Sequence, residues 1–282
     1  MTPTGTKTRW PAAVRLVVLL VVFFGTSSLI ALVVPATTGA PFWCLVLGLV
    51  FAVLALLLYQ GAVRFTERRA VDELRWADAP RGLLRGTGVG IVLFAVTIGL
   101  IAILGGYRIT GGGSFWDAVA ALGVMAAVAV GEELVFRGVL LRLVEELAGT
   151  RAALVISAVV FGGTHLLNPK ATIWGALSIA VEAGLMLGAA YVATRSLWVP
   201  IGLHFGWNFA ETGIFGATVS GGRTESLSLL HSSMPGPEIL NGGAFGPEAS
   251  IFALLVCAVP TILFLRVASR RGLLLSRRSA RA

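Results

Sequence analysis

Charged residues are scarce in this chain. Of its 282 residues, 13% are Asp, Glu, Lys or Arg and 56% are hydrophobic, and the mean hydropathy is +0.88. A soluble domain carries about 25% charged residues, so this chain has too few polar side chains to cover a surface that faces water. An ordinary soluble protein is therefore excluded. The excess of apolar side chains must face lipid, which predicts an all-α, polytopic membrane protein.

Cysteine is also rare, and this excludes a disulfide-stapled scaffold. Cys44 and Cys257 each stand alone in an apolar run, without a C-x-x-C pair, so we expect both to be small core or lipid-facing residues.

Acidic residues are fewer than basic ones, 14 against 22. Such a surplus can indicate nucleic-acid binding, but here the basic residues lie in short segments between apolar runs. These basic residues are interpreted as topology determinants, which fix the side of the membrane on which each connection lies. No nucleic-acid partner is expected.

Long apolar runs are abundant. A membrane-spanning helix needs about 20 mainly apolar residues, and the sequence predicts about eight. The candidates are Ala12–Val34, Phe42–Val63, Leu84–Gly105, Phe115–Gly131, Arg151–Leu167, Ala171–Thr194, Leu197–Ala217 and Ser250–Ala268. The first run exceeds the usual apolar stretch of a signal peptide, about 7–15 residues, so we expect it to be retained.

Basic residues alternate between the connections. The N-terminal flank, the second, fourth and sixth connections and the tail hold Lys7, Arg9, Arg15, Arg64, Arg68, Arg69, Arg75, Arg81, Arg85, Arg142, Arg151, Arg195, Arg266, Arg270, Arg271, Arg277, Arg278 and Arg281. The other connections hold only Arg108, Lys170 and Arg223. Because positive connections stay inside, this pattern predicts an even number of spans and a multi-pass cell-membrane protein with both termini in the cytoplasm.

Three parts of the chain are expected. Residues 1–114 form the first three spans, residues 115–218 a catalytic core, and residues 219–282 an outer loop, the last span and a basic tail. The second connection, Arg64–Arg85, is either a short amphipathic helix on the inner leaflet or a solvated loop. The seventh connection, Val219–Glu248, is rich in Gly, Ser and Pro and predicts an irregular outer loop; its His231 is expected to be solvated.

Ionisable residues occur inside the fourth span, where each costs about 2.5–3.5 kcal/mol on insertion scales and usually marks function. Glu132, Glu133 and Arg137 lie in a helical pattern from Phe115 to Leu147, which is ~50 Å long. Since the hydrocarbon core is ~30 Å thick, the glutamates should fall in the inner half of the membrane. Glu133 and Arg137 have the favourable i,i+4 order of an ion pair. Glu132 points about 100° away without a local cation, as a general base would. The alternative is an ion-paired cluster that only locks helices together.

Histidine is limited to three residues, and two of them belong to spans. Counted from Gly149, which joins the fourth and fifth helices, Glu132 and His165 lie at nearly equal depth, so His165 is predicted to reach Glu132 across the hairpin. Gly162 and Gly163 would allow this close approach. A single histidine at such a depth is more often a helix-to-helix hydrogen bond, and it is the matched carboxylate that favours a site.

The seventh span adds a second polar pair. His204 and Asn208 stand four residues apart, and hence on one helical face. His204 lies only a few residues inside the inner boundary of its span, which suits a cavity open to the cytoplasm. Three helices are thus predicted to bring two histidines, one asparagine and one unpaired glutamate to one depth in an intramembrane polar cavity.

These residues fall into three ordered motifs, E-E-x-x-x-R, F-x-x-x-H and H-x-x-x-N. Here they are Glu132-Glu133…Arg137, Phe161…His165 and His204…Asn208. Together they resemble the CAAX protease and bacteriocin-processing (CPBP) family of intramembrane endopeptidases, which includes the Ras-converting CAAX endopeptidase. The resemblance covers about Ala118–Glu211. It implies hydrolysis of a peptide bond in a membrane peptide or lipidated protein, within the lipid bilayer.

The resemblance also implies roles. Glu132 would activate water, His165 would orient that water or the base, and His204 and Asn208 would stabilise the oxyanion. Arg137 would be structural, acting through Glu133. Phe161 would support the site from its place in the second motif. No Ser or Cys stands in a triad-like arrangement, so a covalent route has nothing to use.

A metal is not favoured, although zinc remains possible. H-E-x-x-H is absent, and a catalytic zinc needs three protein ligands plus water. His165, His204 and Glu132 could supply them, but Glu132 would then be lost as the base unless Glu182 replaced it. Glu182 lies mid-span and either lines the cavity or packs helices; Glu211 could also face the cavity.

Other functions remain open at this point. A zinc-dependent protease of the same kind would use the same residues. A non-catalytic binding or immunity protein of the same fold is not excluded by intact motifs. A transporter with a Glu–His proton relay is disfavoured because no inverted repeat or pair of broken helices is found.

Overall fold

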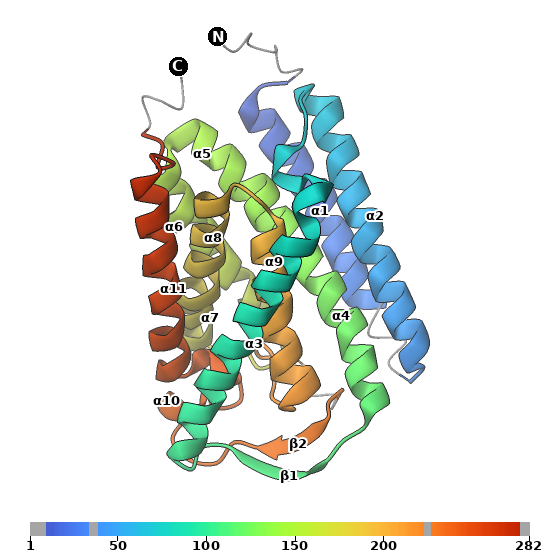
Figure 1. Ribbon diagram of the computed structural model, residues 1–282, viewed down its shortest axis with the longest axis vertical. Coiled ribbons are helices and arrows are strands. Elements are labelled where there is room, and N and C mark those ends of the chain that lie inside the picture. Colours follow the sequence, from blue (N-terminus) through green and yellow to red (C-terminus); the bar gives the residue numbers. More distant parts are fainter. Residues whose placement is uncertain (1–9, 34–38, 223–226, 277–282) are drawn as a thin grey trace.

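Helices make up almost the whole structure, as the apolar composition predicted (Figure 1). The computed structural model describes residues 10–33, 39–222 and 227–276. The predicted topology determinants Lys7, Arg9 and Arg223 and the arginines from position 277 onward lie outside the described residues. The α-helices are α1 (Ala12–Val33), α2 (Pro41–Glu67), α3 (Ala79–Ile103), α4 (Phe115–Glu133), α5 (Arg142–Ala148), α6 (Thr150–Thr164), α7 (Ile173–Ile179), α8 (Met186–Thr194), α9 (Trp198–Asn208), α10 (Glu238–Asn241) and α11 (Ile251–Arg270).

Three π-helical segments continue these helices without a break. They are η4 (Leu134–Leu141) between α4 and α5, η6 (Ala180–Leu185) between α7 and α8, and η7 (Phe209–Ile214) after α9. Four 3₁₀ turns complete the helical elements. They are η2 (Asp72–Leu74), η3 (Trp76–Asp78), η5 (His165–Leu167) and η8 (Pro247–Ala249).

The described part of the chain supports fewer spanning helices than predicted. In it, six helical stretches are long and apolar enough to cross a membrane: Pro41–Glu67, Asp72–Ile103, Phe115–Ala148, Thr150–Leu167, Ile173–Thr194 and Ile251–Arg270. The polytopic all-α fold is therefore confirmed, whereas the count of eight is not supported. In the described residues, α1 counts only as a shorter apolar helix over Ala12–Gly25. The α9–η7 stretch ends too early, at Ile214, because irregular chain replaces the helix there.

The connections that were predicted to be basic gather at one end of the bundle. Arg142 binds Glu67 at 2.6 Å, which ties the start of α5 to the end of α2. Arg195, just after α8, donates to Glu145 of α5 at 3.1 Å and to the carbonyl of Leu273, beyond α11. The beginning of α1 and the end of α11 also lie at this end (Figure 1). The alternation read from the sequence thus corresponds to two physical ends of the molecule.

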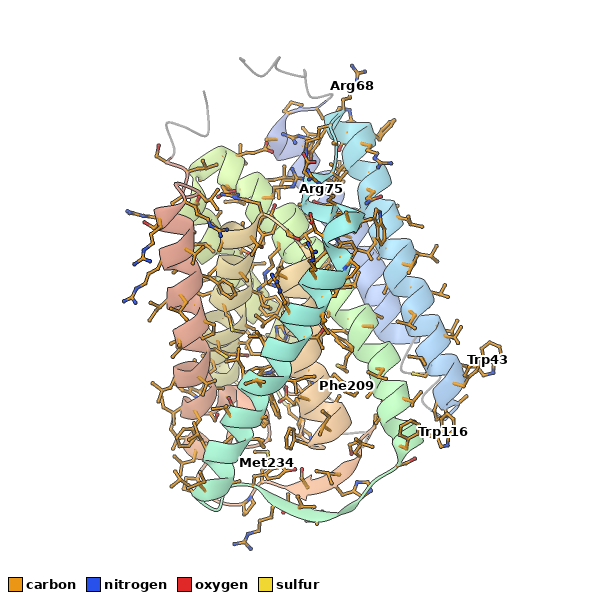
Figure 2. All side chains as sticks on the ribbon, viewed as in Figure 1. Trp43, Arg68, Arg75, Trp116, Phe209 and Met234 are labelled. Atoms are coloured by element: carbon orange, nitrogen blue, oxygen red, sulfur yellow. The ribbon has the colours of Figure 1, made fainter. Side chains whose placement is uncertain are left out.

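Exposed side chains distinguish these two ends. Arg68 and Arg75 project at the end with the buried ion pairs, whereas Trp43 and Trp116 project at the opposite end (Figure 2). Tryptophan is enriched where a membrane helix meets water. Trp116, at the start of α4, therefore marks an interface from which depth along α4 can be measured.

The second connection differs from both predicted alternatives. Val71 and Leu74 are buried under the helix ends instead of lying on a membrane surface. Arg69 binds Glu73 at 2.7 Å, and the Tyr59 hydroxyl shares its single hydrogen between Glu73 and the carbonyl of Gly138, whose oxygens lie at 2.9 and 2.8 Å. The buried carboxylates of this segment are paired with arginines, because a buried charge without a partner would destabilise the fold. The segment is consequently a packed connector that holds η4.

Close packing of glycines sets the position of α9. Gly86 and Gly90 of α3 face Gly202 and Gly206 of α9, and a Cβ atom at any of the four would overlap backbone of the other helix. Both pairs have the four-residue spacing that lets membrane helices approach closely. Because α9 carries His204 and Asn208, this contact fixes the depth and rotation of two predicted site residues.

The end with Trp43 and Trp116 is closed by a small sheet. Strand β1 (Arg108–Gly112) pairs antiparallel with β2 (Leu230–Ser233), and the two run across this end in Figure 1. The predicted irregular loop after Val219 is thus only partly irregular, since it contains β2 and α10. His231 lies on β2 and is exposed.

Candidate active site

The two adjacent glutamates lie in different environments. Glu133 and Arg137 are both fully buried and form an ion pair at 2.8 Å. Arg137 also donates to the carbonyls of Ala183 and Gly184 in η6, at 3.1 and 3.2 Å. Glu132, one residue earlier and therefore rotated by about 100°, keeps 28% of its side chain accessible. One carboxylate is thus held in the core while its neighbour remains open to a reactant.

Each π-helical segment carries one buried ionisable residue. Arg137 belongs to η4, Glu182 to η6 and Glu211 to η7. A π-helical turn is rare and often occurs at functional sites. Arg137 of η4 reaches η6 directly, and α4, which leads into η4, contacts η7.

His204 connects both glutamates. Its Nδ1 lies 2.9 Å from Glu133 Oε1, and its Nε2 lies 3.9 Å from Glu132 Oε2. A carboxylate oxygen can only accept, so Nδ1 carries the hydrogen in the first contact. This contact fixes the ring so that Nε2 faces Glu132. Asn208, also buried, follows one turn later at the end of α9.

His165 is oriented by its own helix. Its Nδ1 lies 2.8 Å from the carbonyl oxygen of Phe161, at the C-terminal end of α6. The carbonyl can only accept, so the hydrogen resides on Nδ1 and the neutral ring presents Nε2 as an acceptor. His165 is half-buried. Its outward nitrogen is therefore suited to receive a hydrogen bond from water or substrate.

The Phe161 ring lies at the centre of the candidate site. Its centroid is 4.9 Å from that of His165 and 6.2 Å from that of His204. The Arg137 guanidinium lies over the same ring at 4.6 Å, a cation–π contact, and Phe136 packs against its edge. All three predicted motifs therefore converge on one aromatic side chain.

One detail of the predicted hairpin differs. Among the described residues, Nδ1 of His165 is hydrogen-bonded to Phe161, and the reach of the other ring nitrogen to Glu132 stays a prediction. Gly162 does allow a close approach, but its partners are Ala176 of α7 and Ala180 of η6. The rotation of α6 about its axis, which places Phe161 toward the centre, is set by packing that the count of residues along the helices did not contain.

Buried carboxyl groups extend beyond the motifs. Glu182 is 1% exposed and accepts from the Cys257 thiol at 3.2 Å, so it does not line an open cavity, and Cys257 has a polar partner that was not expected. Neither carboxyl oxygen of Glu211 has a hydrogen-bond partner among the described residues. Sequence reasoning missed Glu248, which is 2% exposed in η8 and accepts from Ser220 at 2.6 Å. It belongs to a loop, where acidic residues are normally solvated.

The donor set does not form a zinc site as arranged. Within the described residues there is no group of three His, Cys, Asp or Glu side chains placed to hold a metal ion. One nitrogen of His204 is directed at Glu133 and one nitrogen of His165 at a carbonyl. These hydrogen bonds leave the other nitrogen of each ring available, as in a metal-ligating histidine, and the mechanism proposed below uses the residues without assigning a step to a metal.

Comparison with known proteins addresses the same region. Residues 114–210 match the family described as type II CAAX prenyl endopeptidase Rce1-like. This segment is therefore similar to an Rce1-like domain. The match extends from the residue before α4 to the residue before Glu211 and contains all three motifs, so the predicted resemblance is confirmed. No curated protein and no solved structure matches the chain.

The Rce1-like match and the apolar helices support a coarse assignment. They indicate a multi-pass membrane protein of the protease kind, which meets its substrate at or in the lipid bilayer. Ser220 and Glu248 lie outside the matched segment, although they belong to the same folded unit.

Proposed function

We propose that this protein is an intramembrane endopeptidase in which Glu132 activates water to hydrolyse a peptide bond of a membrane-proximal or lipidated substrate. The observation that carries the proposal is the contrast between neighbouring carboxylates. Glu133 is fully buried against Arg137, whereas Glu132 retains 28% accessibility beside His204. A general base must be reachable by the proton that it removes, and Glu132 meets that condition while Glu133 does not.

The gap between Glu132 and His204 suits a reacting water. The two facing atoms, Oε2 and Nε2, lie 3.9 Å apart. This is too long for a direct hydrogen bond, but one water can lie ~2.8 Å from both atoms. Such a water would donate one hydrogen to Glu132 and accept from Nε2 of a protonated His204.

Charge balance favours that protonated ring. Glu132 and Glu133 contribute two negative charges, and Arg137 contributes one positive charge. With His204 as an imidazolium, the four neighbouring groups sum to zero, which avoids an uncompensated charge in an apolar setting. His204 then donates through Nδ1 to Glu133 and through Nε2 toward the reacting atoms.

The reaction follows with atoms and protons conserved. Glu132 removes a proton from water while the water oxygen bonds to the scissile carbonyl carbon. The carbonyl oxygen becomes an oxyanion, for which His204 and Asn208 are the proposed donors. Collapse breaks the carbon–nitrogen bond, and Glu132 returns its proton to the leaving amine. His165 is proposed to orient the water or Glu132 through its accepting Nε2.

The depth of the site indicates from which side the substrate arrives. Glu132 lies 16 residues beyond Trp116 on α4, or ~24 Å along the helix axis. In a hydrocarbon core of ~30 Å, that places Glu132 nearer the end that holds Arg68 and Arg75. We propose that this end faces the cytoplasm, with both termini there, because basic residues are retained inside. Substrates would enter from the inner leaflet.

The test compares matched glutamine variants after reconstitution in liposomes. The probe is an internally quenched peptide with a C-terminal farnesylated CAAX sequence, alongside the same peptide without the farnesyl group. Glu132→Gln keeps the size of the side chain but cannot accept the proton, so cleavage should fall by about 10²–10⁴-fold. His204→Ala and Asn208→Ala should each reduce the rate by about 10²–10³-fold. Glu238→Gln, in the exposed α10, is the control and should keep full activity.

Folding is checked by thermal unfolding of every variant. A Glu132→Gln protein that cleaves at the wild-type rate would overturn the role of Glu132. If wild-type protein cleaves neither peptide, the comparison is repeated on membrane fractions, where new peptide termini should appear with wild-type protein and not with Glu132→Gln. Identical termini in both samples would overturn the protease assignment.

A further inference from the structure

A segment near the C-terminal end of the chain folds back into the candidate active site. We call residues 242–250 the outer strap. It includes η8 and inserts Phe245, Glu248 and Ser250, all of which are buried. Phe245 packs against Gly175 at the start of α7, where a Cβ atom would overlap its ring. The strap thus fills the space beside the turn that joins α6 to α7.

A chain of hydrogen bonds leads from the strap to His165. Glu248 Oε2 accepts from the Ser220 hydroxyl at 2.6 Å. The Ser220 carbonyl accepts from the side-chain amide of Asn168, also at 2.6 Å, and the backbone N–H of Asn168 donates to the carbonyl of His165 at 3.2 Å. Four residues from three distant segments are linked in series, and His165 is at one end.

A second connection fixes the same turn. The Lys170 N–H donates to the carbonyl of Gly221 at 2.9 Å, and the Gly221 N–H donates to the carbonyl of Phe245 at 2.6 Å. The strap is therefore linked to the turn from His165 to Lys170 through both Ser220 and Gly221. Ser220 adopts a left-handed conformation, with φ at 51°, which is uncommon for a residue with a side chain. Such a conformation persists only where surrounding contacts determine it.

Glu248 is buried near two other acidic groups, Glu182 and Glu211. Burial raises the pKa of the Glu248 carboxyl, and the hydrogen bond from Ser220 opposes the rise. Gly246, in the same strap, lies against Glu211. The strap thus carries a buried carboxyl whose hydroxyl donor is Ser220.

We propose that Glu248 is a positioning residue, which holds the His165 turn in place through Ser220 and Asn168. The inference rests on the proposed function for its effect on rate, but its structural content can be tested alone. It assigns part of the active-site geometry to a segment outside the matched Rce1-like region.

The variants separate the hydrogen bond from the charge. Glu248→Gln keeps an oxygen that can accept from Ser220 and should preserve the position of His165. Glu248→Ala and Ser220→Ala each remove the side-chain hydrogen bond between Ser220 and Glu248. Ser220→Ala retains the Cβ atom and hence the strained backbone, so it isolates the hydroxyl. Glu238→Gln neutralises an acidic residue at an exposed position of α10, beside Gly243 of the strap, and is the matched control.

The chain has three histidines, which permits a direct readout. Protein labelled with ¹⁵N-histidine in lipid nanodiscs should give three sets of ring signals, assigned by His165→Gln, His204→Gln and His231→Gln. We expect Glu248→Ala and Ser220→Ala to shift or split the His165 signals and to leave His231 unchanged. Glu248→Gln and Glu238→Gln should match the wild type. Unaltered His165 signals in both alanine variants would overturn the proposal.

Rate measurements provide the second readout. In the cleavage assay, kcat should fall by about 10–100-fold in the alanine variants with little change in KM, because small misplacements of a reacting group have effects of this size. Glu248→Gln should rescue most of the rate. Should Glu248→Ala fail to fold, Ser220→Ala decides the question. If wild-type protein proves inactive, the proposed function fails, while the histidine spectra still decide whether Glu248 positions His165.

Discussion

Removal of Arg137 should impair folding more than any other single change at the candidate site. Its side chain is fully buried and pairs with Glu133 at 2.8 Å. It also binds two carbonyls of η6 and lies over the Phe161 ring. In Arg137→Met all of these contacts are lost, and Glu133 remains as a buried charge with His204 as its only partner. Breaking a buried pair in this way costs about 3–5 kcal/mol.

A second substitution, at Glu133, decides whether the unpaired charge or the lost packing around Phe161 is responsible for the destabilisation. Replacing both members of a buried pair by neutral residues is often close to neutral. Arg137→Met combined with Glu133→Gln should therefore recover at least half of the lost free energy of unfolding, since Gln still accepts from His204. If lost packing around Phe161 dominated instead, the double variant would be no more stable than Arg137→Met. The exposed Arg151 supplies the control, because Arg151→Met should change stability by no more than about 0.5 kcal/mol.

The assay is denaturant unfolding in detergent micelles, followed by fluorescence of the seven tryptophans, with cleavage measured on the same samples. We expect the double variant to be folded but nearly inactive, because His204 has lost the carboxylate that supports its charge. An Arg137→Met protein within about 1 kcal/mol of wild type, yet inactive, would contradict a structural role and would place Arg137 among the reacting groups.

Three other predictions concern the metal, the topology and the packing of α9. Activity should survive exhaustive treatment with a membrane-permeant chelator, and inactivation that added zinc reverses, with one metal bound per chain, would refute the glutamate mechanism. Reporters fused to either terminus should both report the cytoplasm, whereas an outside C-terminus would contradict the even number of crossings. Gly206→Val should destabilise the protein by about 1–3 kcal/mol or more through overpacking, whereas Gly88→Val, with nothing near its Cβ position, should unfold like wild type.

The sequence predicted the site more fully than it predicted the fold around it. The i,i+4 spacing of Glu133 and Arg137 was sufficient to predict their pair, because both lie on one helix and need no tertiary information. The turn at Gly149 was likewise predicted, and its left-handed φ of 84° explains why glycine separates α5 from α6. The equal depth of Glu132 and His165, counted from that turn, stays a prediction.

Rotation and long-range contact could not be predicted in the same way. Phe161 lies at the centre because α6 is turned toward α7, and that rotation depends on Gly162 meeting Ala176. Glu248 was missed because it is 83 residues from His165 in the sequence and lies in a segment that is polar on average. The count of eight spans is not supported by the described residues, for a related reason. Hydropathy counts apolar residues, but the end of the helix at Ile214 follows from the irregular loop beyond it.

The matched segment depends on elements outside it. The position of α9 relies on the glycine face of α3, and η4 is held from α2 by the hydrogen bond from Tyr59 to Gly138. The His165 turn is connected to the strap through Ser220 and Asn168. The reacting groups are thus carried by one contiguous stretch, whereas their relative positions are set by contacts from both flanks. Residues 114–210 expressed alone would leave these backbone and side-chain groups unpaired, so we expect that fragment not to fold.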